Sequence, residues 1–532
     1  MSDSIEQLIA AAEANPVHPE PWGALAQALF ASGDFPGTVQ AALHAAELGY
    51  GEFGEMMVLA SRAAIRDGQI DSASELMQLA LDLRYRDIGG IRADPDFAPL
   101  MSLPNISYRF GLPAPDSTRD QGWQGDIEFF EQELLRRSAN PFALVSAEEM
   151  DSAIAWVFEH VAELSDAEIL LNLGRLLVAL QDGHAYVCPA LERADLLAAL
   201  PVGFYRFEEG VFITHAASAY AHLIGLQVAE IEGRSMAEVA QEIVPTICTD
   251  NPHWPSEIVP FRLRETAFLH ALGLTAHPDR VTLRLMDDAG NLADHTVMAD
   301  NEFPTAPLGR NFPFPDHWVT ALDRFPAKPL SIRDLRTPFW FEPIHELDAI
   351  YLQINNMRDG DDETFAAFTD RFFAMLHETN PDRLIIDIRM NKGGNTTLEW
   401  PFLHTLIASP WNQPGKLFVI IGRRTWSAAQ NFATYLDLHS HAIFAGEPTG
   451  SSPSFTGESI EFVLPWSGTR VNISDLQWQS GWPWDRRPWI PPDLFAQPTW
   501  ESYRAGRDVA LDAIAREIAQ PTLSQTGTGD EQ

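Results

Sequence analysis

From residue 346 onward, short apolar runs alternate with segments of helical periodicity, and this pattern constrains the fold more than any other feature of the chain. Four runs have the composition of buried strands: AIYLQIN (349–355), RLIIDIR (383–389), KLFVIIG (416–422) and HAIFAGE (441–447). Three segments between them have the spacing of helices: 363–379, 398–407 and 427–438. Strands that are apolar on both faces and joined by helices are typical of a parallel sheet covered by helices. The sequence therefore predicts an α/β core, which we place at 311–515.

The N-terminal region has a different pattern, which repeats along the chain. Leu25 lies in a helical segment, Gly33 marks a turn, and a second helical segment follows. The same order recurs about 35 residues later, with Leu59 in the first helix and Gly68 at the turn. This period resembles tetratricopeptide repeats, although alanine replaces the usual glycine after the first leucine; a pair of unrelated helical hairpins is the alternative. We expect residues 1–105 to form all-α repeats that dock a protein partner and do no chemistry.

The middle of the chain changes character near residue 200. Residues 106–200 have mainly helical spacing, whereas residues 201–310 contain short β-branched runs cut by glycine, aspartate and asparagine. Gly225–Gly233, followed by a helical segment at Met236–Ile243, resembles a PDZ-type module. We therefore expect a helical subdomain and then a small β-rich PDZ-like insert. The segment 301–345 is rich in proline and phenylalanine, which predicts a linker or an arm.

The composition narrows the range of partners and compartments. Acidic residues outnumber basic ones 74 to 36 in the 532 residues, and the formal net charge is -38. Such a charge repels nucleic acid and anionic lipid, so we expect neither as a partner. The N-terminus lacks a signal-peptide pattern and no run of about 18 apolar residues occurs, so we expect no membrane span. The chain has two cysteines, Cys188 and Cys248, which fits a reducing cytoplasm. We expect residues 516–532 to form a disordered tail.

The string GRRTWSAAQNF (422–432) directly follows a predicted strand and begins the next predicted helix. It places Ser427 where the strand turns into the helix. Backbone N–H groups at the start of a helix favour developing negative charge, so the position suits the nucleophile of an acyl transfer. A serine in this place also caps many helices, and the string alone does not separate the two roles.

Two further strings flank this one in the predicted core. LIIDIRMNKGGNT (384–396) ends a strand with a glycine pair that includes Gly393, and FAGEPTG (444–450) closes the next strand. In this order the three strings resemble the core of carboxyl-terminal-processing (tail-specific) proteases and of tricorn peptidase, across 106–515. The resemblance implies a crotonase-like α/β core, a peptide or protein substrate, and an oxyanion hole formed by the N–H groups of Gly393 and Ala428.

The resemblance allows two kinds of general base. Tail-specific members use a lysine downstream of the serine, at the position that Ser452 has here, but the three lysines of this chain all precede Ser427: Lys328, Lys392 and Lys416. Tricorn-like members use a histidine in a string like QDGHAYV, which places His184 after a predicted helix. A histidine with an ordinary pKa near 6.5 suits a general base at neutral pH, and we therefore choose His184.

The resemblance also implies an acid that orients the histidine. The stretch PWDRRPWIPPDLFAQPT (483–499) is similar to the part of the family that carries this acid, and it makes Asp485 the candidate. A loop aspartate paired with Arg486 or Arg487 is the alternative at this position.

A neighbouring feature departs from the tricorn-type pattern. Those sites have a serine just before the histidine, whereas this chain has Gly183. Asp182 and Ser452 are the candidates for the supporting role that this serine would have.

Together these features predict a multidomain serine peptidase of the cytoplasm. Ser427 attacks a peptide carbonyl, His184 takes and returns the proton, and Asp485 orients the ring. We expect no metal and no other cofactor: His439 and His441 alternate as metal ligands can, but no third ligand string lies nearby. Two alternatives remain: a peptidase-like binding scaffold that has lost turnover, which Gly183 favours slightly, and an esterase on the same fold. The oligomeric state is not predicted.

Overall fold

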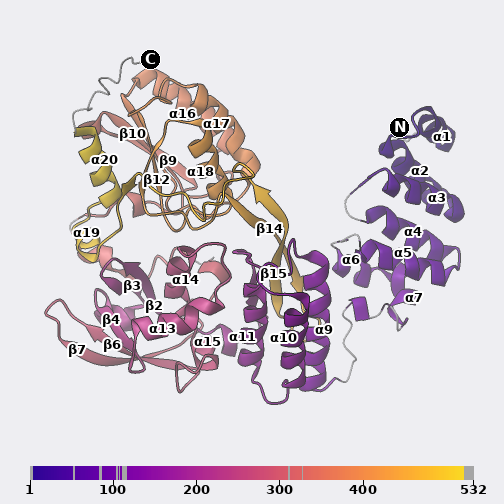
Figure 1. Ribbon diagram of the computed structural model, residues 1–532, viewed down its shortest axis with the longest axis horizontal. Helices are drawn as coiled ribbons and strands as arrows, with labels where there is room; N and C mark the ends of the chain where they lie inside the picture. The colour runs from indigo at the N-terminus through magenta and orange to yellow at the C-terminus, as the bar shows by residue number, and fades with distance from the viewer. Residues whose placement is uncertain are drawn as a thin grey trace, which may run out of the picture. The chain divides into compact units, whose positions relative to one another are not determined.

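The computed structural model divides into two compact units, whose elements are labelled in Figure 1. The first unit comprises Met1–Pro141, Ile154–Ala162 and Phe462–Thr469, and the second comprises Phe142–Ala153, Glu163–Glu461 and Arg470–Gln532. The structure describes residues 4–51, 54–82, 85, 87–103, 106, 108–110, 117–309, 312–325 and 327–519. Within these ranges no helix combines the length and the apolar character that crossing a membrane requires. Most of the predicted tail lies outside the described residues.

The first unit begins with helices that pack consecutively on one another: α1 (Ile5–Ala14), α2 (Pro19–Ser32), α3 (Phe35–Glu47), α4 (Glu55–Arg66) and α5 (Ile70–Asp82). Gly33 ends α2 with φ 85° and Gly68 follows α4 with φ 75°, a backbone conformation in which glycine is preferred. Alanines such as Ala26 and Ala60 are fully buried and allow the helices to approach closely. The predicted helices and turns are confirmed, while their membership of the tetratricopeptide class stays a prediction. Further helices of this unit are α6 (Ile88–Ala93), α7 (Ala98–Met101) and α9 (Arg119–Arg137), and the chain then forms α10 (Ala147–Glu159), whose residues are divided between the two units.

The second unit contains a six-stranded sheet with the order β16-β13-β12-β11-β10-β9. The strands are β9 (Phe339–Ile344), β10 (Ala349–Ile354), β11 (Arg383–Asp387), β12 (Leu417–Ile421), β13 (Ile443–Gly446) and β16 (Leu494–Phe495). From β10 to β16 all neighbours are parallel, and β9 pairs antiparallel with β10. The predicted parallel α/β core is therefore present.

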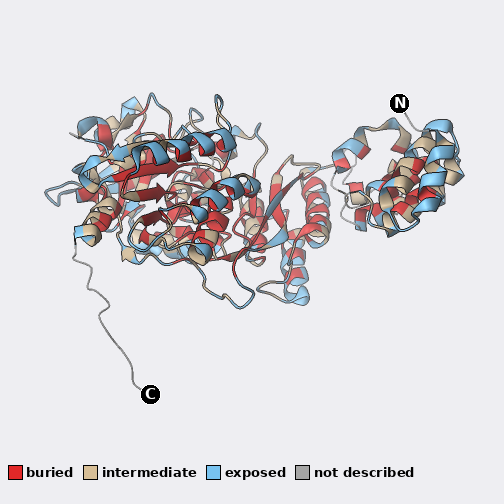
Figure 2. Cartoon of the chain, turned by 90° about the horizontal axis from the view of Figure 1, so that it is seen from above, coloured by how far each residue is buried: buried red, intermediate tan, exposed pale blue. Residues whose placement is uncertain are grey.

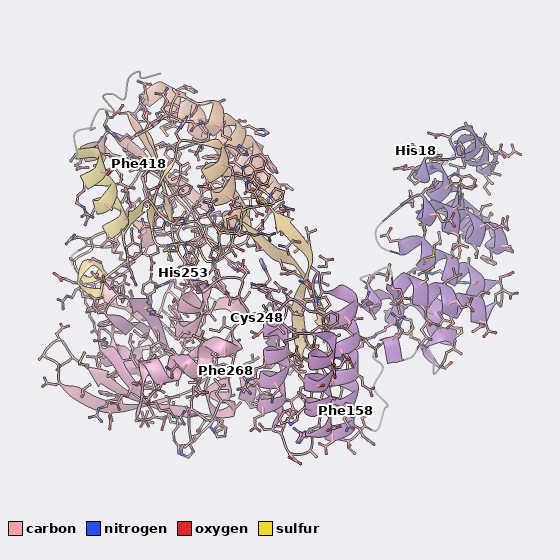
Figure 3. All side chains as sticks on the ribbon, in the orientation of Figure 1. His18, Phe158, Cys248, His253, Phe268 and Phe418 are labelled. Carbon is pink, nitrogen blue, oxygen red and sulfur yellow. The ribbon has the colours of Figure 1, made fainter. Side chains whose placement is uncertain are left out.

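Helices cover this sheet on both faces (Figure 1). One face packs on α16 (Phe365–Thr379), α17 (Glu399–Ala408) and α18 (Ala428–His439), and the other on α20 (Val509–Ala519). Alternate strand residues point to opposite faces, so Leu352 joins the first cluster and Tyr351 the second. Figure 2 shows these strands as buried, and Phe418 of β12 lies among them in Figure 3. Burial on both faces explains why the strand sequences are apolar throughout.

One part of this core differs from the sequence prediction. Residues 301–345 were expected to form a linker or an arm, but Phe339–Ile344 is strand β9 at the edge of the sheet. Pro343 breaks the usual strand composition, and proline is tolerated at a sheet edge because its missing N–H faces away from the ladder. The proline therefore concealed a strand that the neighbouring aromatic residues support.

A second sheet of the same unit is antiparallel and follows the order β2-β3-β4-β6-β7. Its strands are β2 (Val202–Phe207), β3 (Gly210–Ala216), β4 (Gln227–Ile231), β6 (Arg280–Met286) and β7 (Leu292–Met298); β5 (Arg234–Ser235) and β8 (Val319–Thr320) pair at its margins. The helices α13 (Met236–Ile243), α14 (Trp254–Arg262) and α15 (Thr266–Ala271) accompany it. The predicted β-rich region is confirmed, and its relation to PDZ modules stays a prediction.

A third, three-stranded sheet positions the segment that carries His184. Helix α11 (Asp166–Val178) precedes that segment, and β1 (Tyr186–Cys188) follows it. β1 pairs antiparallel with β15 (Arg470–Gln479), with Tyr186 opposite Asn472, and β15 pairs with β14 (Ser454–Val463). A strand from late in the chain thus holds the end of the early helical segment.

Candidate active site

Ser427 lies between β12 and α18, at the junction that the sequence predicted. Its backbone has φ 58° and ψ -126°, a conformation that residues with a side chain rarely adopt. Such strain costs on the order of 1–3 kcal/mol and persists where the surrounding structure imposes it. The Ser427 side chain makes no capping hydrogen bond to the helix. The simple capping role that the sequence left open is therefore not what this serine performs.

The side chain of Ser427 instead contacts His184. The distance from Ser427 Oγ to His184 Nε2 is 2.9 Å, although the two residues are 243 positions apart in the chain. Hydrogen bonds hold the loop before the serine: Thr425 Oγ1 donates to the Ile388 carbonyl at 3.1 Å, and the Trp426 N–H donates to the Asn391 carbonyl at 3.2 Å. The position of Ser427 is thus anchored to the end of the adjacent strand.

The imidazole of His184 is fixed by aromatic rings and by its backbone. Trp426 stacks on the ring at a centroid distance of 3.8 Å, and Phe455 stacks at 5.7 Å. Trp254 of α14 stacks in turn on Trp426 at 4.8 Å. The His184 carbonyl accepts a hydrogen bond of 2.7 Å from Asn472 Nδ2 of β15. These contacts leave the ring little freedom, and its Nε2 faces the serine.

Asp182 is the acid that the structure places beside His184. Its Oδ1 accepts the His184 backbone N–H at 2.9 Å and lies 3.8 Å from His184 Nδ1. Its carboxylate also accepts the backbone N–H of Ser474 at 2.8 Å and the Ser474 hydroxyl at 3.1 Å. Burial raises the pKa of Asp182 to about 7, although these hydrogen bonds oppose the rise. Asp182 therefore changes its charge near neutral pH.

A second acid, Asp250, lies close to this group. Its Oδ2 accepts the backbone N–H of Ser452 at 3.0 Å and the Ser452 hydroxyl at 3.1 Å. Burial raises the pKa of Asp250 to about 6, and its charge adds to the rise at Asp182. A Cβ added at Gly183 would lie 3.3 Å from Asp250 Oδ1. The space beside this glycine, where tricorn-type sites carry a serine, thus adjoins a carboxylate that the sequence prediction did not include.

The two residues that the sequence predicts for an oxyanion hole lie against Ser427. Gly393 has φ 96°, and a Cβ added there would come within 2.7 Å of both Ala428 N and Ser427 Cβ. Ala428 is the first residue of α18, so its N–H has no acceptor one turn earlier in the helix. The Gly393 N–H donates to Oδ1 of the buried Asn391 at 2.8 Å. The N–H groups of Gly393 and Ala428 thus both adjoin Ser427, and the Asn391 side chain accepts the hydrogen bond of the Gly393 N–H.

Asp485 has a different environment. Its carboxylate accepts the backbone N–H of Arg487 at 3.0 Å and pairs with the Arg487 guanidinium at 2.8 Å. Arg487 also contacts Asp437, and the hydrogen bond from Arg487 lowers the pKa of Asp485. This ion pair is the alternative that the sequence left open for Asp485. The structure brings Ser427, His184 and Asp182 together, and it places Asp485 in an ion-pair cluster with Arg487.

Several residues of the site carry no signal in a single sequence. Asp250, Trp426 and Phe455 meet His184 or its neighbours through tertiary contacts between segments that lie far apart in the chain. Of these three residues, Trp426 could most easily have been identified from the sequence, because it directly precedes Ser427. Within the part of the chain that the structure describes, no three His, Cys, Asp or Glu side chains gather in a way that could hold a metal ion.

Comparison with known proteins supports the fold. No protein-family model matches the chain, and a search of curated proteins finds no match. The fold is similar to that of mature CPAF complexed with lactacystin, with a TM-score of 0.53 and 12% sequence identity over 76% of this chain and 98% of that one. A structure of mature CPAF gives a TM-score of 0.52 at 12% identity, with 76% and 97% covered. The photosystem II D1 C-terminal processing protease gives 0.37 at 14% identity, with 76% and 98% covered. At these identities the likeness to mature CPAF shows a shared fold.

Proposed function

We propose that the chain is a serine peptidase that hydrolyses peptide bonds with Ser427 as nucleophile and His184 as general base. The observation that carries the proposal is the 2.9 Å contact between Ser427 Oγ and His184 Nε2. The strained backbone of Ser427 and its place before α18 support it, because the same geometry exposes a nucleophile beside helix N–H groups. The fold shared with mature CPAF and the three strings that resemble tail-specific and tricorn peptidases agree with it.

The geometry supports a two-stage reaction. As Ser427 Oγ attacks the carbonyl carbon, its proton passes to His184 Nε2, and the carbonyl oxygen becomes an oxyanion. The N–H of Ala428 and that of Gly393, once released from Asn391, would stabilise that oxyanion. His184 then returns the proton to the leaving amine, and the acyl group stays on Ser427. A water molecule then attacks the acyl carbon and gives a proton to His184. The bond between the acyl carbon and Ser427 Oγ breaks, His184 returns the proton to Oγ, and the acid product leaves.

We assign the orienting role to Asp182 and not to Asp485. A carboxylate beside Nδ1 fixes the tautomer of a catalytic histidine and stabilises the imidazolium. Asp182 Oδ1 lies 3.8 Å from Nδ1, whereas Asp485 pairs with Arg487. The pKa of about 7 for Asp182 means that this support increases as the pH rises through neutrality.

Hydrolysis assays test the proposal and separate it from an esterase. The purified chain is incubated with a library of short peptides and with p-nitrophenyl esters, and the products are identified by mass spectrometry. We expect peptide cleavage that is lost in Ser427→Ala and kept in Ser440→Ala, a control at the opposite end of α18. Cleavage of esters alone would assign the site to an esterase. Peptide cleavage that survives in Ser427→Ala would refute the proposal.

One observation favours the second candidate, a binding scaffold without turnover. The hydrogen bond from Gly393 N–H to Asn391 Oδ1 occupies a donor that the reaction needs. If this bond persists with substrate bound, the site lacks half of its oxyanion hole. Asn391→Ala separates the two readings. If the chain is a peptidase, the parent protein hydrolyses peptides measurably. If it is a scaffold, the parent protein hydrolyses none, and activity appears only in Asn391→Ala, in which the Asn391 amide no longer occupies the Gly393 N–H.

A further inference from the structure

A cavity of about 450 Å³ lies in the second unit, apart from the Ser427 and His184 side chains. It is bounded by β2 and β3, by α14, and by the loop between β12 and α18. Its walls are strongly aromatic, with Phe204, Phe261, Phe312, Phe314 and Trp318 among them. The volume falls in the range of about 300–1,000 Å³ that is usual for small-molecule sites. This space is therefore large enough for a ligand with an apolar body.

The balance of basic and acidic side chains around this cavity is the opposite of that in the whole chain. Acidic residues outnumber basic ones 74 to 36 overall, yet basic side chains outnumber acidic ones around the cavity. Several of the basic groups already have partners: Arg389 pairs with Asp508 at 2.8 Å, and Arg333 pairs with Glu342 at 2.9 Å. Arg424, which lies three residues before Ser427, is also ion-paired, but only through its Nε with Glu257.

Arg424 is buried and incompletely paired. Its residue is 4% exposed, and its guanidinium lies 4.0 Å from the centre of the Phe312 ring. Its Nε is 3.1 Å from Glu257 Oε1, but Glu257 also faces Arg423 at 3.5 Å. The contact with Glu257 is an ion pair that leaves the buried Nε without a hydrogen bond, and among the residues that the structure describes no acceptor engages Nη1 or Nη2 of Arg424. Burial lowers the pKa of Arg424, so the attraction of Glu257 does not compensate for the loss of water.

These features define the chemistry of a ligand. A buried guanidinium with two unused terminal nitrogens matches the two oxygens of a carboxylate, which accept parallel hydrogen bonds from such a fork. Burying a guanidinium without its full set of hydrogen bonds is costly, and Arg424 Nε is buried without one, so an anion placed beside this group is stabilised. The aromatic walls favour an apolar body attached to that anion. A carboxylic acid with an aromatic group meets both requirements.

We propose that this cavity binds a small monocarboxylic acid with an aromatic body, whose carboxylate pairs with Nη1 and Nη2 of Arg424. The carboxylate lies beside Phe312, and the aromatic body lies against Phe314 and Trp318. The site does not depend on the proposed peptidase activity, because it uses neither Ser427 nor His184.

Isothermal titration calorimetry with 3-phenylpropanoate tests the proposal on the full chain. We expect saturable binding of 3-phenylpropanoate, at least about tenfold weaker binding of the neutral 3-phenylpropanamide, and at least about tenfold weaker binding of acetate, which lacks the aromatic body. Arg424→Gln should weaken binding of the acid at least about tenfold. Arg333→Gln is the matched control, because Arg333 lines the same cavity but is paired with Glu342 and exposed; it should change the affinity less than about threefold.

The outcomes decide the question. The proposal is overturned if the acid does not bind at millimolar concentration, if acid and amide bind equally, or if Arg424→Gln leaves the affinity unchanged. Should Arg424→Gln fail to fold, the double variant Glu257→Gln, Arg424→Gln removes both charges of the pair and gives the same test. Equal losses in Arg333→Gln and Arg424→Gln would show non-specific attraction and would also overturn it.

Discussion

Replacing Asp182 by asparagine tests how the candidate base is oriented. The substitution keeps the size of the side chain and removes the charge that lies 3.8 Å from His184 Nδ1. Two unit charges about 4 Å apart attract each other by about 4 kcal/mol at an effective dielectric constant of about 20. About 4 kcal/mol of lost stabilisation of the imidazolium corresponds to roughly a thousandfold in rate. Because asparagine keeps part of the hydrogen bonding, we expect a loss of about a hundredfold to a thousandfold.

The assay is the second-order rate constant for covalent labelling of Ser427 by a fluorophosphonate, which requires no knowledge of the natural substrate. It is measured at pH 8, where an Asp182 with a pKa of about 7 is largely ionised. The matched control is Asp485→Asn, which removes a carboxylate of the same kind from its pair with Arg487. We expect labelling of Asp485→Asn within about threefold of the parent chain, with a modest fall in melting temperature.

The reverse result would refute this assignment. If Asp485→Asn loses labelling while Asp182→Asn keeps the parent rate, the late acid orients the histidine, as the sequence resemblance implied. Equal and complete loss in both variants would require circular dichroism spectra and melting curves, since unfolding of either variant abolishes labelling without bearing on the histidine.

Three further predictions follow from the same geometry. The unfolding free energy of Ser427→Gly should exceed that of Ser427→Ala by about 1 kcal/mol, because glycine adopts φ 58° without strain, and Ser427→Gly should therefore have the higher melting temperature. Equal stabilities of the two variants would show that the backbone is unstrained. Gly393→Ala should abolish labelling and lower the melting temperature, since its Cβ would come within 2.7 Å of Ala428 N; parent-like labelling would contradict the close approach. A pKa of about 7 at Asp182 means that the folded chain binds this proton more tightly than the unfolded chain, so unfolding free energy falls as pH rises from about 4 to about 7, by up to about 4 kcal/mol from this group. Asp182→Asn should therefore gain stability relative to the parent between pH 4 and pH 8, and a pH-independent difference in chemical denaturation would disprove the raised pKa.

The alternation of apolar runs and helical segments predicted most of the α/β core. The strand expected at 383–389 is β11 (Arg383–Asp387), and the helix expected at 427–438 is α18 (Ala428–His439). Such elements are predictable because burial on both faces imposes the same apolar composition along the whole strand. Strand β9 was missed, since its edge position relaxes that requirement and admits Pro343.

The site was partly predictable for a different reason. Ser427 and His184 each lie in a short sequence string that identifies the residue without knowledge of its neighbours in space. The sequence therefore predicts both residues, whose side chains lie 2.9 Å apart in the structure. The environment of an acid depends on which distant segments surround it. Nothing near Asp182 in the sequence shows that Ser474 bonds to its carboxylate across 292 positions, or that Asp250 lies close enough to raise its pKa. Asp485 was predicted to orient His184 because of a resemblance to a family. Its ion-pair partner in the structure is Arg487, which lies only two residues away in the sequence.

The most direct test of the central claim is mass spectrometry of the full chain after exposure to a fluorophosphonate at pH 8. We predict one adduct per chain on the peptide that contains Ser427, absent from Ser427→Ala and strongly reduced in His184→Ala, which lacks the ring 2.9 Å from the hydroxyl. Both variants must keep the parent's circular dichroism spectrum. No adduct on the parent chain, or an adduct formed at the same rate in folded His184→Ala, would contradict the account.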